Sequence, residues 1–238
     1  MAVHSEDIEY HVDRLRLVGE LSVDDSTSSP RPAVLVCHEG NGLTDHSRDV
    51  ARRLAELGFV AFALDYYGDG KPLAPEDMGA RFQELDGDRL RTRAIADAGL
   101  QQLLASPYAD RSRVAAIGFC FGGTMSLELG RSGADVKAIV GFHSGLGTSR
   151  PEDAANISGR VLVCIGSEDP FVPPEQRTAF EDEMRAGGVD WRMNLYGGQV
   201  HSFTNPAVDA MGNPALRYDA TTAARSWRAM LDLFTEVF

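Results

Sequence analysis

The hydrophobic residues of this chain gather in short continuous runs that are separated by amphipathic stretches and polar turns. Few polar side chains interrupt the apolar runs at residues 33–37, 59–64, 114–117, 136–142 and 161–165. Such runs are typical of parallel strands that are covered on both faces. Residues 8–12 and 15–23 alternate between polar and apolar positions and predict a pair of strands, and residues 191–196 predict a last strand.

Helical patterns lie between these strands. Asp45 is expected to cap the first helix and Gly58 to close it. The apolar face of this helix is expected to contain Val50, Ala51, Leu54 and Leu57. Further helices are expected at residues 90–104, from 124 onward, at 174–186 and at 218–238. Strands that alternate with helices predict an α/β fold with a mostly parallel, doubly wound central sheet and helices on both of its faces.

Two segments lack a regular pattern. Residues 24–32 are polar and predict a loop, and residues 65–86, rich in Asp, Gly and Pro, predict a second and longer loop. Loops of that length often serve as functional lids, so we expect residues 65–86 to shape a substrate pocket. No repeat, low-complexity tract or linker interrupts the chain, and we therefore expect a single domain over residues 1–238.

The most informative segment is Gly118-Phe119-Cys120-Phe121-Gly122-Gly123, which joins an expected strand to an expected helix. A nucleophile between glycines at a strand-to-helix turn forms a nucleophile elbow. The turn holds its central residue in a strained conformation, and small neighbours make room for it. Cys120 is therefore the candidate nucleophile, and the backbone N–H of Phe121 is a candidate donor to an oxyanion. A packing cysteine in a Gly-rich turn is the alternative.

A thiol nucleophile needs a base or a charged partner. Asp169 follows the expected strand at 161–165, and His201 follows the strand at 191–196. Both side chains are thus expected at the carboxyl ends of strands, where ligands bind in open α/β sheets. Each alone could be an ordinary turn or loop residue. Their order after Cys120, first the acid and then the histidine, is that of a hydrolase triad and favours catalysis by all three.

A glutamate and a glycine follow the expected strand at 33–37. The loop after this strand normally supplies a second N–H to the oxyanion, and Gly40 is the candidate for it. A carboxylate near the nucleophile is unusual because it disfavours a nearby anion. Glu39 could instead accept the thiol proton, and a solvated loop glutamate is the alternative.

The composition and net charge exclude some classes of binding partner. The chain has 238 residues and a net charge of -12 at pH 7, which argues against binding to nucleic acid or to an anionic membrane. Residues 1–7 are polar and acidic and do not predict a secretory signal. The cysteines Cys37, Cys120 and Cys164 form no C-x-x-C pair, which fits a reducing cytoplasm. Cys37 and Cys164 are expected to be packing residues. The oligomeric state stays open.

Together these residues resemble the dienelactone hydrolase family of α/β-hydrolases. The resemblance extends from about residue 10 onward and rests on Glu39, the Cys120 elbow, Asp169 within residues 166–173, and His201-Ser202-Phe203. It implies a triad of Cys120, His201 and Asp169, and a Glu39 that holds and deprotonates the resting thiol. It also implies that an ester or enol-lactone is opened through an acyl-enzyme, with no metal or organic cofactor.

The segment after the histidine departs from the family pattern. Family members that act on a carboxylate-bearing lactone grip the carboxylate with arginines, one of them shortly after the histidine. Residues 204–207 of this chain, Thr-Asn-Pro-Ala, contain no arginine, and Arg81 is the candidate for the other grip. His143 stands where such enzymes carry a pocket aromatic. Further candidate substrate contacts are Tyr66, Tyr67, Ser202 and Phe203. The substrate is expected to be a small-molecule ester or lactone.

Two other functions share parts of these motifs. A glutamine amidotransferase also has a thiol elbow, but it places a glutamate two residues after the histidine, where this chain has Phe203. A non-enzymatic ligand-binding or redox-sensing protein could use the same scaffold. A receptor needs no general base, so the set of Cys120, Asp169 and His201 favours a hydrolase.

Overall fold

The structure is a computed structural model that describes residues 3–26 and 28–238. The chain forms two compact units, one ending at Ile117 and the other beginning at Gly118. The single domain over residues 1–238 stays a prediction. The polar N-terminal segment 1–7 and the expected loop at 24–32 include residues 1, 2 and 27, which lie outside the described residues.

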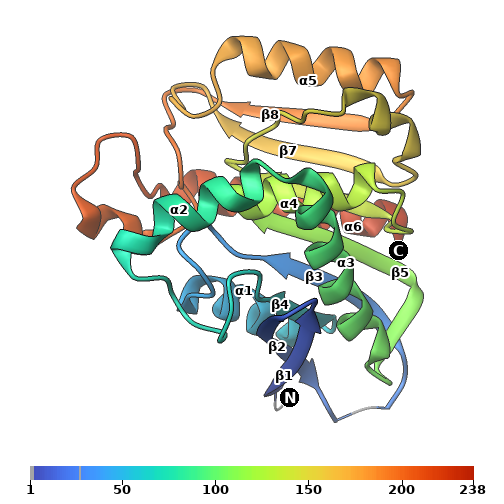
Figure 1. The fold of residues 1–238 in the computed structure, drawn as a ribbon. Helices are drawn as coiled ribbons and strands as arrows, with labels where there is room; N and C mark the ends of the chain where they lie inside the picture. Colours follow the sequence, from blue (N-terminus) through green and yellow to red (C-terminus); the bar gives the residue numbers. More distant parts are fainter. Residues whose placement is uncertain (1–2, 27) are drawn as a thin grey trace. The chain divides into compact units, whose positions relative to one another are not determined.

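The first unit is built on strands whose hydrogen-bonded order is β1-β2-β4-β3-β5 (Figure 1). These strands are β1 (Val3–Val12), β2 (Leu15–Asp24), β3 (Arg31–Cys37), β4 (Val60–Leu64) and β5 (Ala109–Phe119), of which β5 ends in the second unit. β1 pairs with β2 and β2 with β4 in antiparallel fashion, whereas β3 and β4 are parallel, with Val34 beside Ala61. The predicted strand pair and the predicted buried strands are therefore confirmed.

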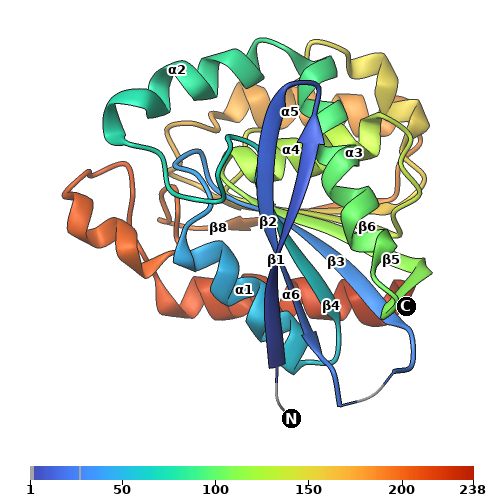
Figure 2. The ribbon, with the colours of Figure 1, turned by 60° about the horizontal axis from the view of Figure 1, so that its bottom comes forward.

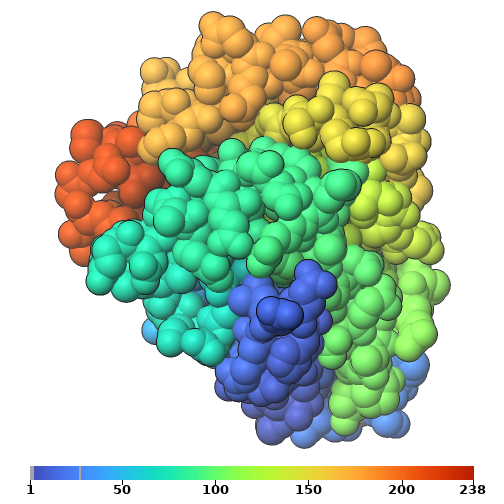
Figure 3. All heavy atoms as spheres, viewed as in Figure 1, coloured from blue at the N-terminus to red at the C-terminus, as the bar shows by residue number. Residues whose placement is uncertain are grey.

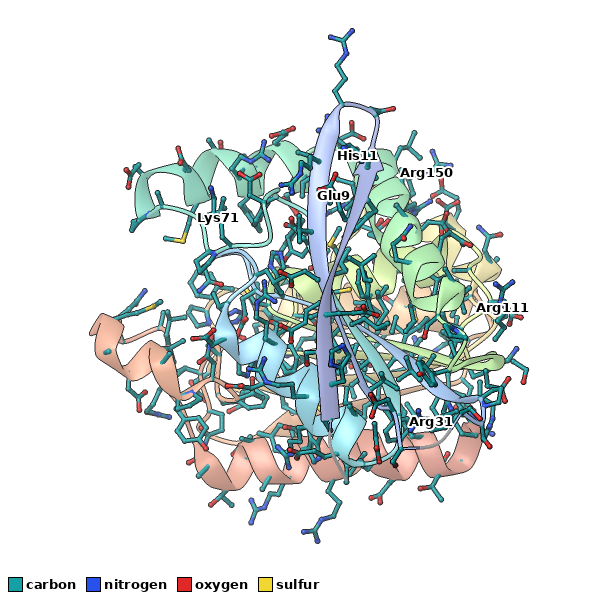
Figure 4. The ribbon with its side chains drawn as sticks, turned by 90° about the horizontal axis from the view of Figure 1, so that it is seen from below. Glu9, His11, Arg31, Lys71, Arg111 and Arg150 are labelled. Atoms are coloured by element: carbon teal, nitrogen blue, oxygen red, sulfur yellow. The ribbon has the colours of Figure 1, made fainter. Side chains whose placement is uncertain are left out.

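The β1–β2 hairpin is exposed on one face. Glu9 and His11 are exposed, while Tyr10 between them is buried. Figure 4 labels Glu9 and His11 on this hairpin. The Tyr10 hydroxyl donates a hydrogen bond to the carbonyl oxygen of Asp65 at 2.5 Å. The alternation of polar and apolar residues thus corresponds to one solvated and one packed face.

Helices cover both faces of the strands of the first unit (Figure 2). Helix α1 (Asp45–Glu56) contacts β2, β3 and β4, and helix α3 (Arg89–Ala105) contacts β1, β3 and β4. The buried residues of α1 include Val50, Ala51 and Leu54, as predicted. Apolar side chains at this spacing lie on one side of a helix, so the sheet buries them.

The ends of α1 differ from the prediction in two details. The N-cap is Thr44, and Asp45 is the first helical residue, where its carboxylate is favoured by the helix dipole. Leu57 is 51% exposed and does not belong to the apolar face, because it is the C-cap after the last helical turn. Gly58 follows it with a φ of +90°, a conformation that favours glycine and closes the helix.

The prediction that residues 65–86 form a loop without pattern is wrong, because helix α2 (Pro75–Asp86) occupies its second half. Only Leu85 of this helix is buried, so the sequence carries no apolar periodicity there. Figure 3 shows the α2 segment, in teal, on the surface. The first half is a turn that the Asp65 carboxylate holds by accepting hydrogen bonds from the backbone N–H groups of Val18, Tyr67, Gly68 and Gly70.

The second unit contains three parallel strands in the order β6-β7-β8. Its strands and helices are α4 (Phe121–Arg131), β6 (Ala138–Phe142), β7 (Arg160–Gly166), α5 (Pro174–Ala186), β8 (Trp191–Tyr196) and α6 (Ala220–Val237), with 3₁₀ helices at Pro151–Asn156 and Pro206–Met211. Helices α4 and α6 both contact β6 and lie in front of and behind the strands in Figure 1. The predicted bounds of α5 and β8 are confirmed.

A buried ion network ties α4 to α5 in the second unit. Arg131, at the end of α4, is fully buried and donates to both carboxylate oxygens of Glu183 on α5, at 2.7 and 2.8 Å. The same guanidinium donates to Glu128 at 2.9 Å and to the carbonyl oxygen of Leu146 at 3.0 Å. Arg131, at the C-terminal end of α4, therefore also holds the loop that follows β6.

No helix within the described part of the chain is long and apolar enough to cross a membrane.

Candidate active site

Cys120 lies between the end of β5 and the start of α4 in a sharp turn. Its φ is +54° and its ψ is -121°, a conformation that L-residues rarely adopt and that marks a strained site. A Cβ atom added to Gly118 would lie 2.0 Å from the carbonyl oxygen of Gly122, and one added to Gly123 would lie 2.2 Å from Cβ of Ser144. Glycine is thus required at both positions, which explains the spacing of the motif.

The turn places Cys120 beside the strands of the second unit. Its backbone N–H donates to the carbonyl oxygen of Phe142, the last residue of β6, at 3.0 Å. Phe121 is the first residue of α4 and directly follows Cys120. A helix N-terminus favours an anion, so the donor role of the Phe121 N–H stays a prediction.

Asp169 and His201 form a buried pair in the same unit. Asp169 follows β7, His201 follows β8, and His201 Nδ1 lies 2.7 Å from Asp169 Oδ2. The second oxygen of Asp169 accepts a hydrogen bond from the N–H of Phe171 at 2.9 Å. Both carboxylate oxygens are thus held, and the carboxylate fixes the orientation of the imidazole ring.

His201 also interacts with the side chain of Cys120. Burial disfavours the charged imidazolium, but the Cys120 thiolate and the Asp169 carboxylate outweigh it and raise the pKa of His201 to about 10. The three residues therefore interact as one set that favours an imidazolium at neutral pH.

The loop that carries His201 turns back on itself. Ser202 is buried with a φ of +58°, and Phe203 is fully buried, with its ring 5.6 Å from that of Tyr196. The backbone of His201 exchanges hydrogen bonds with residues 215 and 217, at 3.1 Å each. The structure thus places the candidate substrate contacts Ser202 and Phe203 in the interior of the second unit.

His143, the other candidate from the sequence, is fully buried directly after β6. The edges of the His143 and His201 rings meet with their centroids 5.0 Å apart, and Nε2 of His143 lies 2.8 Å from Oγ1 of Thr204. His143 therefore contacts the loop that carries His201.

Phe171 lies next to the Asp169–His201 pair. The sequence analysis did not identify it as a candidate. Its side chain is 54% exposed, and its ring meets the His201 ring at 76° with centroids 5.0 Å apart. An apolar residue just after the candidate acid, at the carboxyl end of a strand, is the signal that could have identified it.

In the first unit, Glu39 follows β3 and is buried. Its Oε1 lies 2.7 Å from Nδ1 of His46, on the first turn of α1. Sequence reasoning did not single out His46, although its place at the start of the following helix could have drawn attention to it. A Cβ atom on the neighbouring Gly40 would lie 3.9 Å from Cδ2 of Phe82, an exposed side chain of α2.

Tyr66 and His38 hold the segment that carries Glu39. The Tyr66 hydroxyl lies 2.5 Å from the carbonyl oxygen of His38 and 2.9 Å from that of Glu39. The two rings stack with centroids 3.5 Å apart. Burial lowers the pKa of His38 to about 4, so its ring is neutral, and its Nδ1–H donates to the Glu39 carbonyl oxygen at 2.5 Å. Tyr66, a candidate substrate contact, is fully buried in this arrangement.

Arg81 lies on α2 and is bound within its own unit. It donates to Glu84 at 2.9 Å and to the carbonyl oxygen of Tyr67 at 2.5 Å, and its guanidinium lies 5.9 Å from the centre of the Tyr67 ring. Tyr67 itself is buried. The carboxylate grip of Arg81 and a substrate contact of Tyr67 stay predictions.

No group of three or more His, Cys, Asp or Glu side chains in residues 3–26 and 28–238 is arranged to hold a metal ion.

Comparisons with known proteins agree on one family. The family model described as the dienelactone hydrolase family matches residues 21–238. A protein of Aquifex aeolicus with the provisional name carboxymethylenebutenolidase is 27% identical over 85% of this chain and 87% of its own.

Two solved structures are more similar. The structure named m3DLH is 49% identical, covers 100% of both chains and has a TM-score of 0.97. A dienelactone hydrolase-like promiscuous phosphotriesterase from metagenomic libraries is 45% identical, again over 100% of both chains, with a TM-score of 0.95.

Proposed function

This chain belongs to the dienelactone hydrolase family, and on that premise we propose that it cleaves a small carboxylic ester or dienelactone-like lactone through a thioester on Cys120. The coarser part is established: the chain is a hydrolase of ester bonds with the α/β-hydrolase fold and a mostly parallel sheet. The observation that carries the finer part is the buried Asp169–His201 hydrogen bond, together with the interaction of His201 with Cys120.

In the reactive form of the proposed site, an imidazolium of His201 faces a thiolate of Cys120. A pKa of about 10 keeps the ring protonated at neutral pH, and the Cys120 charge contributes to that value. The thiolate, and not the thiol, is the nucleophile of cysteine enzymes. The ion pair thus supplies the attacking sulfur and the proton for the leaving group together.

Acylation follows from this ion pair. The Cys120 sulfur attacks the carbonyl carbon, a C–S bond forms, and the carbonyl electron pair moves to oxygen. The N–H groups of Phe121 and Gly40 bind this oxyanion. When the intermediate collapses, the bond to the leaving oxygen breaks, and that oxygen takes the proton of His201. A thioester and a neutral imidazole remain.

The charge of Cys120 regulates His201 during the reaction. The negative charge of Cys120 is the largest of the causes that raise the pKa of His201, and thioester formation removes this charge. Burial then makes the imidazolium a stronger acid at the stage that needs a proton. Neutral His201 takes a proton from water, the hydroxide adds to the thioester carbonyl, and the thiolate leaves. The carboxylic acid is released and the ion pair is restored.

Glu39 has a further role in the proposal. We infer that it accepts the thiol proton when the ion pair first forms, which is the role that the family resemblance implies. Its buried position after β3 and the 2.7 Å distance from its Oε1 to Nδ1 of His46 support a carboxylate with a fixed orientation. A Glu39→Gln variant should lower turnover and leave the fold intact.

A second substrate class is favoured by one relative. The metagenomic structure that is 45% identical is named a promiscuous phosphotriesterase. A phosphotriester also presents an electrophilic centre with a leaving alcohol, so a thiolate with an adjacent acid suits it. Diethyl 4-nitrophenyl phosphate tests this class, and release of nitrophenol that requires Cys120 would support it.

The three cysteines are free thiols. Thiols without disulfides are typical of reducing compartments, so a cytoplasmic location belongs to the proposal.

The decisive experiment compares wild type, Cys120→Ala and Cys164→Ala on a small p-nitrophenyl ester and on a dienelactone. Cys164 is a matched control because burial raises the pKa of its thiol to about 12 and keeps it unreactive. We expect activity to be lost in Cys120→Ala alone, and a thioester mass on Cys120 after rapid quenching. Equal activity in all three proteins would refute the thiol mechanism.

A further inference from the structure

We propose that His143 and Thr204 are positioning residues that hold the His201 loop in its reactive geometry. The inference rests on the proposed function, since it concerns the orientation of the triad histidine. It gives His143 a different task from the substrate contact that its place in the sequence indicated. Neither residue touches the reacting atoms in the mechanism above.

The His143 ring is fixed on a rigid base. The residue follows β6 directly, and its backbone N–H donates to the carbonyl oxygen of Cys164 on β7 at 2.8 Å. Its φ of +40° is one that few non-glycine residues adopt, so the backbone turns sharply there. The preceding residue, Phe142, accepts the N–H of Cys120 at 3.0 Å. His143 is thus held beside the nucleophile turn by the ends of two strands.

From this base, His143 reaches three of four consecutive residues of the His201 loop. Its ring meets that of His201 at 66° and that of Phe203 at 85°, with centroids 5.0 and 5.1 Å apart. Its Nε2 shares a hydrogen bond of 2.8 Å with the Thr204 hydroxyl. The ring contacts are not directional enough to fix a loop, whereas the hydrogen bond is.

The backbone of the loop is fastened at His201, by residues 215 and 217, and at Phe203, whose carbonyl oxygen accepts the N–H of Asp219 at 3.1 Å. The bond from His143 to Thr204 adds a side-chain support to these backbone contacts. Ser202, between His201 and Phe203, has a left-handed backbone, and the chain reverses there. Asp169 holds His201 at Nδ1. The ring contacts with His143 and with Phe171 act on the rest of the imidazole. The distance from His201 to the Cys120 sulfur therefore depends on where the 201–204 segment is fastened.

The test uses the threonine, because its substitution perturbs the core least. Thr204→Val keeps the shape and removes the hydroxyl, and Thr204→Ser restores the hydroxyl. Thr178→Val, on the exposed face of α5, is the matched control. The ester assay gives kcat and KM. The pH dependence of Cys120 alkylation by iodoacetamide gives a readout without substrate, and the buried Cys37 and Cys164 do not interfere.

We expect kcat of Thr204→Val to fall about tenfold with little change in KM, since losing one hydrogen bond corresponds to a change of that order. The pH of half-maximal alkylation should rise, because a displaced imidazolium stabilises the thiolate less. Thr204→Ser should recover most of both. His143→Phe, which keeps a ring but not Nε2, should behave like Thr204→Val, and the two changes should not add.

Two results would overturn the inference. One is a Thr204→Val protein with wild-type kcat and alkylation profile. The other is a variant whose melting temperature falls while both readouts stay unchanged, which indicates a merely structural bond. Either result would leave the proposed function standing, because that depends on the loss of activity in Cys120→Ala.

Discussion

Glu39 Oε1 lies 2.7 Å from Nδ1 of His46, and both side chains are largely buried. A protonated imidazole this close to a buried carboxylate favours the charged form of the carboxylate. His46 thus supports the carboxylate form of Glu39, which is the form that can accept a proton.

The first prediction concerns this pair. His46→Phe removes the imidazole beside Glu39 and should lower kcat/KM by about tenfold, since losing a contact with a charged group has an effect of that order. Glu39→Gln should lower it at least as much. The double variant should be no worse than Glu39→Gln alone, because His46 acts only through Glu39. Steady-state kinetics of the four proteins check this. Additive losses would show that His46 acts by another route.

The second prediction concerns pH. With its pKa raised to about 10, His201 keeps its proton where a histidine of ordinary pKa, 6.5, has lost it. The rate of acylation should therefore persist through pH 7–9 and fall as the pH rises through about 10. Asp169→Asn removes one cause of the raised pKa, so its alkaline limb should move to lower pH. Profiles of kcat/KM, corrected for spontaneous hydrolysis, test the shift, and coincident limbs would argue against the assignment.

Much of the architecture was predictable because it depends on local patterns. Buried parallel strands appear as continuous apolar runs, and the glycines around Cys120 reflect contacts of about 2 Å that any Cβ would make. Because Asp169 and His201 follow predicted strands, the sequence predicts both at one edge of the sheet. In the structure, Asp169 Oδ2 lies 2.7 Å from His201 Nδ1. These features follow from steric demands on few residues.

What could not be predicted depends on tertiary contacts. Helix α2 buries only Leu85, so its sequence has no apolar period. The His46–Glu39 and His143–Thr204 contacts join residues whose spacing in the sequence does not indicate that they touch. The exposed ring of Phe171 becomes informative only when His201 is seen 5.0 Å away. One sequence gives residue types at strand ends, but not which of them touch.

The third prediction assigns Phe171 to the leaving group. The ring borders His201, which protonates the leaving oxygen in the proposed mechanism, and its exposure leaves it open to an apolar ligand. Phe171→Ala should raise KM several-fold for aryl esters and less for methyl esters of the same acid, because aromatic contacts contribute about 1 kcal/mol. Leu195→Ala, another exposed apolar change in this unit, is the control. Equal effects on both ester types would contradict the assignment.

The last prediction concerns the buried Arg131. Its guanidinium pairs with both Glu128 and Glu183, all three being buried, and joins α4 to α5. Arg131→Met leaves two carboxylates without their cation and should lower the free energy of unfolding by about 3–5 kcal/mol. Arg185→Met removes an exposed pair with Asp182 on α5 and should cost less than about 1 kcal/mol. Urea unfolding at pH 7 measures both. If the two variants lost the same stability, the buried network would not be what holds α4, and with it the turn of Cys120, against α5.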